Sequence, residues 1–221
     1  MTAPVPPSNR QIPLDLPVRT ALGAEDYVVS ASNRDAVAWL DRWPDWPGPA
    51  LAIYGPQGCG KTHLAHVWQA RSRARFLDAT LPDGPPPAAN LILDEIRLPE
   101  ERLFHLYNHV TAAGGSLLIL SREAPARWPV RLADLASRLA SIPAIAVAAP
   151  DDALLAAVLA KHFADRQLAV GADVIDHLAH HIERSFAAAA ETAAALDSAA
   201  LAQQRRPSLA LAREVLKQLG H

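Results

Sequence analysis

The sequence predicts an α/β fold, with a parallel five-stranded sheet followed by a small all-helical lid domain. Three observations lead to this prediction. Short apolar runs alternate with helical patterns up to about residue 150, which is typical of a parallel, doubly wound sheet. A glycine-rich stretch, GPQGCGKT, stands between one of these apolar runs and the next helix. After Pro150, every remaining segment has a helical pattern.

The elements follow in order along the chain. Apolar residues at helical spacing, with breaks such as PDWPGP and Gly114-Gly115, predict helices at 31–43, 61–74 and 99–114. The first of these has Ser32 or Asn33 as its expected cap. Short apolar runs bounded by turn residues predict buried strands at 50–55, 74–79, 90–95, 116–121 and 144–149.

We expect three parts in the chain: a flexible arm at 1–20, the α/β domain at 21–149 and the lid domain at 150–221. The arm holds five prolines, which favour an extended and poorly ordered segment. Asp151, directly after Pro150, is the expected cap at the hinge. The lid is expected to contain helices at 151–166, 171–182, 185–202 and 207–219.

The composition excludes several classes of protein. With 221 residues, 50% hydrophobic and 20% charged, the chain is long and apolar enough for one sizeable core. A net charge of −2 gives no strong positive field, so direct DNA binding is not favoured. A single cysteine excludes an internal disulfide, and neither a signal peptide nor an apolar run of membrane-spanning length is found. We therefore expect a cytoplasmic protein that does not contact a membrane.

The stretch GPQGCGKT matches the phosphate-binding loop pattern G-x-x-x-x-G-K-[ST]. Its glycines allow backbone N–H groups to converge on phosphate oxygens, and the following helix adds its positive dipole end. Lys61 is expected to neutralise the outer phosphates, and Thr62 to offer a hydroxyl ligand to Mg²⁺. All eight residues are expected to bind nucleotide: Gly55, Pro56, Gln57, Gly58, Cys59, Gly60, Lys61 and Thr62.

A pair of acidic residues, Asp94 and Glu95, ends the predicted strand at 90–95. In open α/β sheets, ligands bind at the carboxyl ends of the strands. Asp94 is therefore expected to hold Mg²⁺ through water, and Glu95 to be a candidate catalytic residue that polarises the water attacking the γ-phosphate.

The combination of the phosphate-binding loop, LILDE and a helical lid resembles the AAA+ family. A closer resemblance, to the DnaA/Hda family of replication-initiation proteins, rests on DYVVSASNRDAVAWL, GKTHLAHVW, LFHLYN and LADLASRL, and it covers residues 11 to 218. It implies an AAA+ P-loop domain with bound ADP or ATP and Mg²⁺. It further implies that Val28, Val29 and Asn33 border the adenine, although they are equally suited to packing and capping. Arg138 would be the arginine finger, acting on a nucleotide held by a neighbouring subunit.

The resemblance also implies a sensor-1 and a sensor-2 position, and at these two positions this sequence differs from the family pattern or aligns with it less firmly. Arg184 would be the sensor-2 arginine of the lid, or Ala187 would stand there if the alignment shifts by one helical turn. Ser121 is the sensor-1 candidate. Where the relatives carry Asp, this chain reads Ser121-Arg122-Glu123, which argues against a fast ATPase.

The arm contains QIPLDL, which resembles the hexapeptide that binds the DNA polymerase III sliding clamp (β subunit), with Gln11, Leu14 and Leu16 as anchors. Because the chain reads only as far as the lid, we expect contact with DNA only indirectly, through the clamp. The resemblance implies DnaA as the second partner, and a homo-oligomer is possible.

The leading hypothesis is a negative regulator of replication initiation that is nucleotide-bound and associated with the clamp. It would use Arg138 to stimulate hydrolysis of ATP on DnaA, with ADP as its own implied ligand. Whether the chain is itself an enzyme stays open. One alternative is an autonomous AAA+ ATPase such as a helicase loader of the DnaC type. Another is a non-catalytic adaptor that joins DnaA to the clamp.

Overall fold

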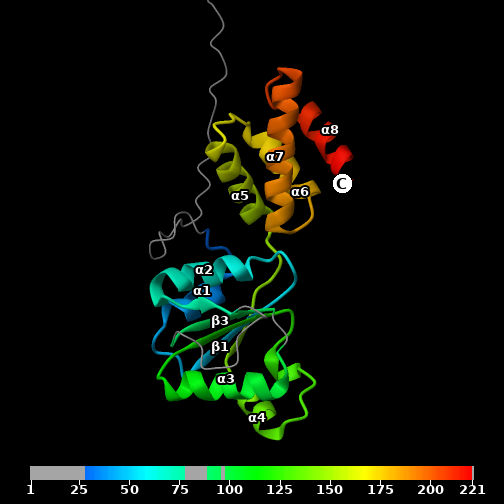
Figure 1. The fold of residues 1–221 in the computed structure, drawn as a ribbon. Helices are drawn as coiled ribbons and strands as arrows, with labels where there is room; N and C mark the ends of the chain where they lie inside the picture. Colours follow the sequence, from blue (N-terminus) through cyan, green and yellow to red (C-terminus); the bar gives the residue numbers. More distant parts are fainter. Residues whose placement is uncertain (1–27, 78–88, 96–97, 221) are drawn as a thin grey trace, which may run out of the picture.

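The computed structural model describes residues 28–77, 89–95 and 98–220. They form an α/β domain, with the helices that follow residue 150 set above it (Figure 1). Gln11, Leu14 and Leu16 of the predicted clamp-binding peptide lie outside the described residues.

The sheet is parallel throughout and has the strand order β2-β3-β4-β1-β5. The predicted α/β class with a five-stranded parallel sheet is therefore confirmed. All strands fall inside the predicted runs, but β2 and β5 are shorter than expected. The strands are β1 (Ala50–Tyr54), β2 (Arg75–Phe76), β3 (Leu91–Asp94), β4 (Leu117–Ser121) and β5 (Ala144–Ala146).

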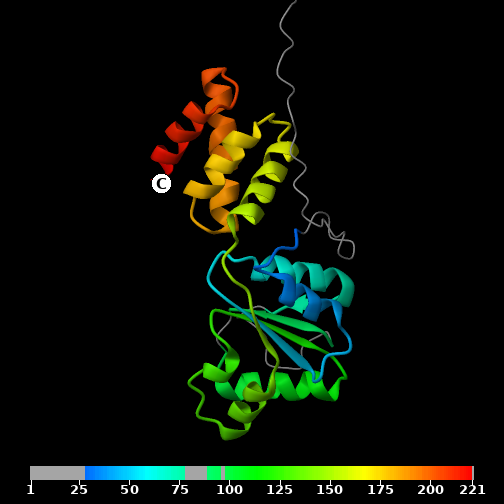
Figure 2. The same cartoon turned by 180° about the vertical axis from the view of Figure 1, so that it is seen from behind.

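Helices cover both faces of the sheet (Figures 1 and 2). On one face, α1 (Arg34–Asp41) and α2 (Lys61–Ser72) pack on a core that includes Leu51 and Ile53 of β1. On the other face, α3 (Glu100–Ala112) and α4 (Ala133–Ser141) pack on a core that includes Ala50 and Ala52. Successive residues of a strand thus enter opposite cores, which explains why β1 reads as an unbroken apolar run. A short 3-10 helix, η1 (Pro125–Arg127), precedes α4.

The lid is a bundle of four helices with a core of its own. Leucine and alanine side chains from every helix of the bundle meet in this core, together with Phe163. Asp151 accepts a hydrogen bond from the N–H of Leu154 at 2.8 Å, so the expected cap at the start of the bundle is confirmed. The helices are α5 (Asp152–Asp165), α6 (Ala172–His181), α7 (Phe186–Gln203) and α8 (Leu209–Leu219).

Within the described part of the chain, no helix combines the length and apolarity needed to cross a membrane.

Candidate nucleotide-binding site

The loop between β1 and α2 has a backbone that depends on its glycines. Gly58 has φ +77° and Gly60 has φ +96°, in the left-handed region that favours glycine. Gly55 is constrained by space, because an added Cβ would lie 2.1 Å from the carbonyl oxygen of Val147. Two of the glycines are therefore required by backbone conformation and the third by space, and together they allow the chain to curl at the N-terminus of α2.

Lys61 is the first residue of α2, and its ammonium group folds back over the loop. Its Nζ donates to the carbonyl oxygens of Gly55 at 3.0 Å and Pro56 at 2.9 Å. A third contact joins Nζ to Oε1 of Glu95 at 3.2 Å. The residue is only 5% exposed, so the positive charge is fixed rather than free to rotate in solvent. The expected phosphate-binding cation is thus held at the loop by three oxygens.

Thr62 and Asp94 meet across the start of α2 and the end of β3. The hydroxyl of Thr62 donates to Oδ2 of Asp94 at 2.9 Å. These two side chains offer a hydroxyl and a carboxylate oxygen, the kind of ligand that Mg²⁺ prefers. The donor set therefore fits the expected ion, with the remaining ligands left to phosphate and water. Among the described residues, no group of three or more His, Cys, Asp or Glu side chains forms a separate metal site.

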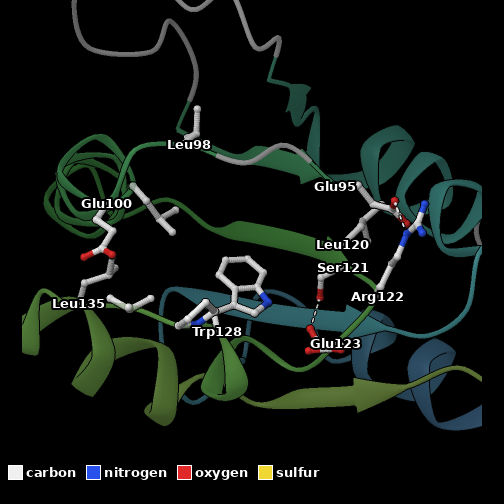
Figure 3. Close-up of a pocket in the computed structure, with 12 residues that line it drawn as sticks. Glu95, Leu98, Glu100, Leu120, Ser121, Arg122, Glu123, Trp128 and Leu135 are labelled. Atoms are coloured by element: carbon white, nitrogen blue, oxygen red, sulfur yellow. Dashed lines mark hydrogen bonds and ion pairs between the residues drawn. The ribbon is translucent and has the colours of Figure 1, made fainter.

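Glu95, directly after β3, has both carboxylate oxygens engaged, and Figure 3 shows the contact with Arg122. Oε1 contacts Lys61, and Oε2 accepts from Nε of Arg122 at 3.2 Å. Burial raises the pKa of Glu95, but the hydrogen bonds and charges of Lys61 and Arg122 outweigh it and leave the pKa lowered. The backbone has φ +50°, an uncommon conformation for glutamate, and its N–H donates to Leu120 at 3.0 Å.

Arg122 belongs to the stretch Ser121-Arg122-Glu123, where the sequence departs from the family's sensor-1 pattern. It follows β4, and its Nη2 donates to Oε1 of Gln57 at 3.1 Å while its Nε donates to Glu95. The neighbouring sensor-1 candidate, Ser121, is buried and donates from Oγ to the backbone oxygen of Glu123 at 2.6 Å. Of these two residues, Arg122 is the one with side-chain contacts to both the loop and the acidic residue.

The segment predicted to border the adenine is tied to the loop side of the sheet. Asn33 is buried, accepts from the N–H of Ser30 at 2.9 Å and donates to the carbonyl of Val28 at 3.1 Å. Val29 packs against the same core as Cys59 of the loop. Asn33 precedes α1, but its side chain makes no capping hydrogen bond to that helix, because it folds back on the segment before it. Asn33 thus stands at the predicted N-cap position of α1, without the side-chain hydrogen bond that usually accompanies it.

Cys59 fills space beneath the loop. Its side chain is buried, and burial raises the pKa of the thiol, although Lys61 partly offsets this. The thiol is therefore kept protonated, in keeping with a small packing residue rather than a reactive one.

The lid reaches the loop through the start of α7. The N–H of Phe186 donates to the carbonyl of Gly58 at 3.2 Å. A Cβ added to Gly58 would lie 2.6 Å from Cβ of Ser185, and one added to Gly60 would lie 2.7 Å from the ring of Phe186. No local sequence pattern signals this packing, because it joins residues more than a hundred positions apart.

The predicted sensor-2 residues are arranged differently from the expectation. Arg184 lies just before α7, and its Nη2 forms an ion pair with Oδ1 of Asp152 in α5 at 2.8 Å. Ala187 is exposed in the first turn of α7 and has no charge to offer a phosphate. In this conformation the positions at the start of α7 that contact the loop are Ser185 and Phe186.

Arg138 lies on α4 and packs against α3. Its guanidinium carbon is 4.6 Å from the ring centre of Phe104 and 5.3 Å from that of Tyr107, and Nη1 donates to Asn108. Because α4 covers the sheet face opposite to α2, the side chain does not join its own phosphate-binding loop. An arginine in this place serves either packing within the chain or another molecule.

A cavity of about 480 Å³ opens beside Glu95 and Arg122, beyond the ends of β3 and β4 (Figure 3). Its polar rim includes these two residues and Ser121. Its floor is apolar and is formed by Leu98, Leu103, Leu120, Trp128, Val130 and Leu135.

No protein-family model matches the sequence, and no curated protein matches it. Solved structures do. Domain III of the replication initiation protein DnaA from Thermotoga maritima has a TM-score of 0.74 at 17% identity, over 87% of this chain and 94% of that chain. AMPPCP-bound DnaA from Aquifex aeolicus has a TM-score of 0.59 at 18% identity, over 72% of this chain and 59% of that chain. The Thermotoga maritima Holliday junction branch migration motor RuvB has a TM-score of 0.62 at 13% identity, over 77% of this chain and 62% of that chain.

The chain therefore has an α/β fold like that of domain III of DnaA. At identities of 13 to 18%, these structural likenesses show the fold alone, and function has to be argued from the residues of the site.

Proposed function

We propose that this chain is an Hda-like regulatory AAA+ protein of replication initiation. It binds ADP or ATP with Mg²⁺, associates with the sliding clamp, and stimulates the hydrolysis of ATP held by DnaA. The observation that carries the proposal is an assembled phosphate-binding loop, with Lys61 at its centre, on a fold like that of DnaA domain III.

Nucleotide binding is supported by the loop itself. Its glycines hold the curled backbone, Lys61 supplies a fixed cation, and Thr62 with Asp94 supplies oxygen ligands for Mg²⁺. Bound Mg²⁺ would shield the phosphate charge. The Aquifex aeolicus DnaA with this fold binds AMPPCP, a nucleotide analogue, which is in keeping with a nucleotide here.

Action on a partner is supported by the contrast between Glu95 and Arg138. Glu95 has both oxygens occupied by cations of its own chain, which disfavours rapid hydrolysis of its own nucleotide. Arg138 lies on the opposite side of the sheet from the loop, so its guanidinium is suited to the nucleotide of a second molecule. An arginine supplied in trans stabilises the charge of the transition state in phosphoryl transfer.

Association with the clamp rests on QIPLDL alone, whose anchors would be Gln11, Leu14 and Leu16. An extended peptide can enter a groove without unfolding any part of the domain. The clamp would bring the chain to DNA in the cytoplasm without direct DNA contact, and tethering would raise its concentration near DnaA. The proposed assembly is with DnaA, a homo-oligomer is the alternative, and the stoichiometry of the complex distinguishes the two.

The test is a hydrolysis assay of DnaA-bound ATP with clamp-loaded DNA. Arg138→Ala is expected to remove the stimulation while ADP binding stays within about twofold, because the residue is remote from its own loop. Arg206→Ala, an exposed arginine between α7 and α8, is the matched control and should stimulate normally. The double variant with Gln11→Ala and Leu14→Ala should lose only the part of the stimulation of DnaA that depends on the clamp.

The alternatives give different results in this assay. An autonomous ATPase of the helicase-loader kind would hydrolyse ATP without DnaA and lose that turnover with Glu95→Gln. A non-catalytic adaptor would tolerate Arg138→Ala and fail only when the arm is changed. Normal stimulation by Arg138→Ala would contradict the proposal.

A further inference from the structure

We propose that Arg122 is a positioning residue that restrains the chain's own ATP hydrolysis by occupying a carboxylate oxygen of Glu95. The inference rests on the proposed nucleotide-binding function and adds a built-in brake to it.

Hydrolysis needs a free acceptor beside the water. The water oxygen forms a bond to the γ-phosphorus, and the bond from that phosphorus to the β–γ bridging oxygen breaks. ADP leaves with that electron pair, and a proton of the water passes to a base, so that ADP and inorganic phosphate result. Glu95 is placed to be that base, but Lys61 holds Oε1 and Arg122 holds Oε2. Each oxygen of a carboxylate bound in this way has one lone pair fewer to accept a proton from water.

The two cations are not equivalent. Lys61 is 5% exposed and is fixed by two loop carbonyls in addition to Glu95. Arg122 is 64% exposed and has no such backbone contacts among its described partners. Lys61 is also expected to bind the phosphates, so its removal would disturb nucleotide binding as well as Glu95. Arg122 is therefore the partner whose removal would free an oxygen of Glu95.

Arg122 also joins two walls of the site. Its guanidinium donates from Nε to Glu95 and from Nη2 to Gln57, which come from the end of β3 and from the phosphate-binding loop. A planar guanidinium that makes two such contacts is held in one orientation. The side chain thus lies across the opening between the loop and the acidic residue (Figure 3).

The backbone at Glu95 supports the same assignment. Its φ of +50° is uncommon for a residue with a side chain, and it persists only where surrounding contacts hold it. The hydrogen bond to Leu120 fixes the backbone, and the two cations fix the carboxylate.

The experiment measures ATP turnover by the isolated full-length chain, with Mg²⁺ and without DnaA. Because exposed ion pairs are weak, Arg122→Ala is expected to raise kcat about 3- to 10-fold. KM for ATP and the Kd for ADP should change less than about twofold, since Lys61 and the loop are intact. Arg122→Lys, which keeps the charge but loses the planar fork, should give an intermediate kcat.

Two controls locate the effect. Arg127→Ala, an exposed arginine in η1, should leave turnover at the wild-type level. The double variant with Arg122→Ala and Glu95→Gln should return to background, because the added turnover depends on the carboxylate. Thermal unfolding with and without ADP shows that each variant is folded and binds nucleotide.

The possible failures are distinguishable. Unchanged or reduced kcat in Arg122→Ala, with normal ADP binding, would overturn the restraint and leave the proposed function standing. Added turnover that survives Glu95→Gln would overturn the role of Glu95 in it. Absence of ADP and ATP binding by the wild-type chain would overturn both the proposed function and this inference.

Discussion

Two arginines of this chain, Arg122 and Arg138, lie in regions that are built in opposite ways. Around Arg122, the loop and the ends of β3 and β4 converge, and the side chains of Lys61, Glu95 and Arg122 contact neighbours in the same site. Around Arg138, α4 lies on α3, on the other face of the sheet, and the guanidinium rests on aromatic rings. The charged groups of the first region lie around the phosphate-binding loop of this chain, whereas Arg138 lies away from that loop.

This difference suggests how one fold can bind a nucleotide and still act on another molecule. Both carboxylate oxygens of Glu95 contact cations of the same chain, while Arg138 lies on the other face of the sheet. Substitutions in and around the first region are expected to have effects that decrease from Lys61 to the cap of α7.

The largest effect is expected from Lys61→Ala. It removes a buried ammonium group that contacts two loop carbonyls and Glu95. Charge-assisted hydrogen bonds contribute about 1.5–3 kcal/mol each, so the Kd for ADP should rise about 100-fold or more. Isothermal titration calorimetry measures the loss. Lys217→Ala, at an exposed position on α8, is the matched control, and an equal loss in both variants would contradict a specific role for Lys61.

Gly60→Ala tests the packing of the lid on the loop. The substitution places a Cβ at φ +96° and 2.7 Å from the ring of Phe186, so it costs about 1–3 kcal/mol of strain. Nucleotide affinity should fall about 10-fold, and the free energy of unfolding should fall as well. Adding Phe186→Ala should restore part of the affinity, since it relieves the clash but not the dihedral strain. No restoration would mean that the ring does not limit the loop.

Glu95→Gln tests the electrostatics of the site through pH. The pKa of Glu95 is lowered below its ordinary value of 4.5, so its carboxylate stabilises the fold fully above pH 4.5. That contribution is lost as the pH falls through the lower folded-state pKa. Urea unfolding should therefore show that wild type loses more stability than Glu95→Gln between about pH 5 and pH 3. Parallel pH curves for the two proteins would show that the ion pairs contribute nothing.

The smallest expected effect comes from the cap of α7. Ser185 accepts from the N–H of Ala188 at 3.1 Å, and Ser208 accepts from the N–H of Leu211 at the start of α8 at 3.4 Å. Alanine at either position should lower the free energy of unfolding of the lid by about 1 kcal/mol. Only Ser185→Ala should also weaken ADP binding, about two- to threefold, because α7 alone begins at the loop. Equal ADP binding by the two variants would show that the start of α7 does not contribute to the nucleotide site.

Much of the fold was predictable because local signals suffice for it. Buried parallel strands read as apolar runs, and the phosphate-binding loop has a fixed spacing between β1 and α2. The shortness of β2 and β5 could not be read, because strand length depends on which neighbour pairs with it. Asn33 stands at the predicted N-cap position of α1, but its side chain bonds backward to Val28 and Ser30 and not to the helix, which the sequence could not reveal.

The contacts that define the site were beyond sequence reasoning for the same reason. Arg122 and Glu95 are brought together only because β3 and β4 are adjacent in the sheet. Arg184 could pair with phosphate or with an acidic residue, and the choice of Asp152 depends on how α5 and α7 pack. A motif can therefore point to a functional residue, but the partner of that residue depends on the tertiary structure.

The most direct test of the central claim asks which molecule's nucleotide is hydrolysed. DnaA is loaded with ATP labelled at the γ-phosphate, this chain is loaded with unlabelled ADP, and labelled phosphate release is followed in a single turnover with clamp-loaded DNA. The account predicts rapid release with wild type and with Arg122→Ala, and a rate lower by about 1,000-fold or more with Arg138→Ala. Equal release with wild type and Arg138→Ala would contradict it.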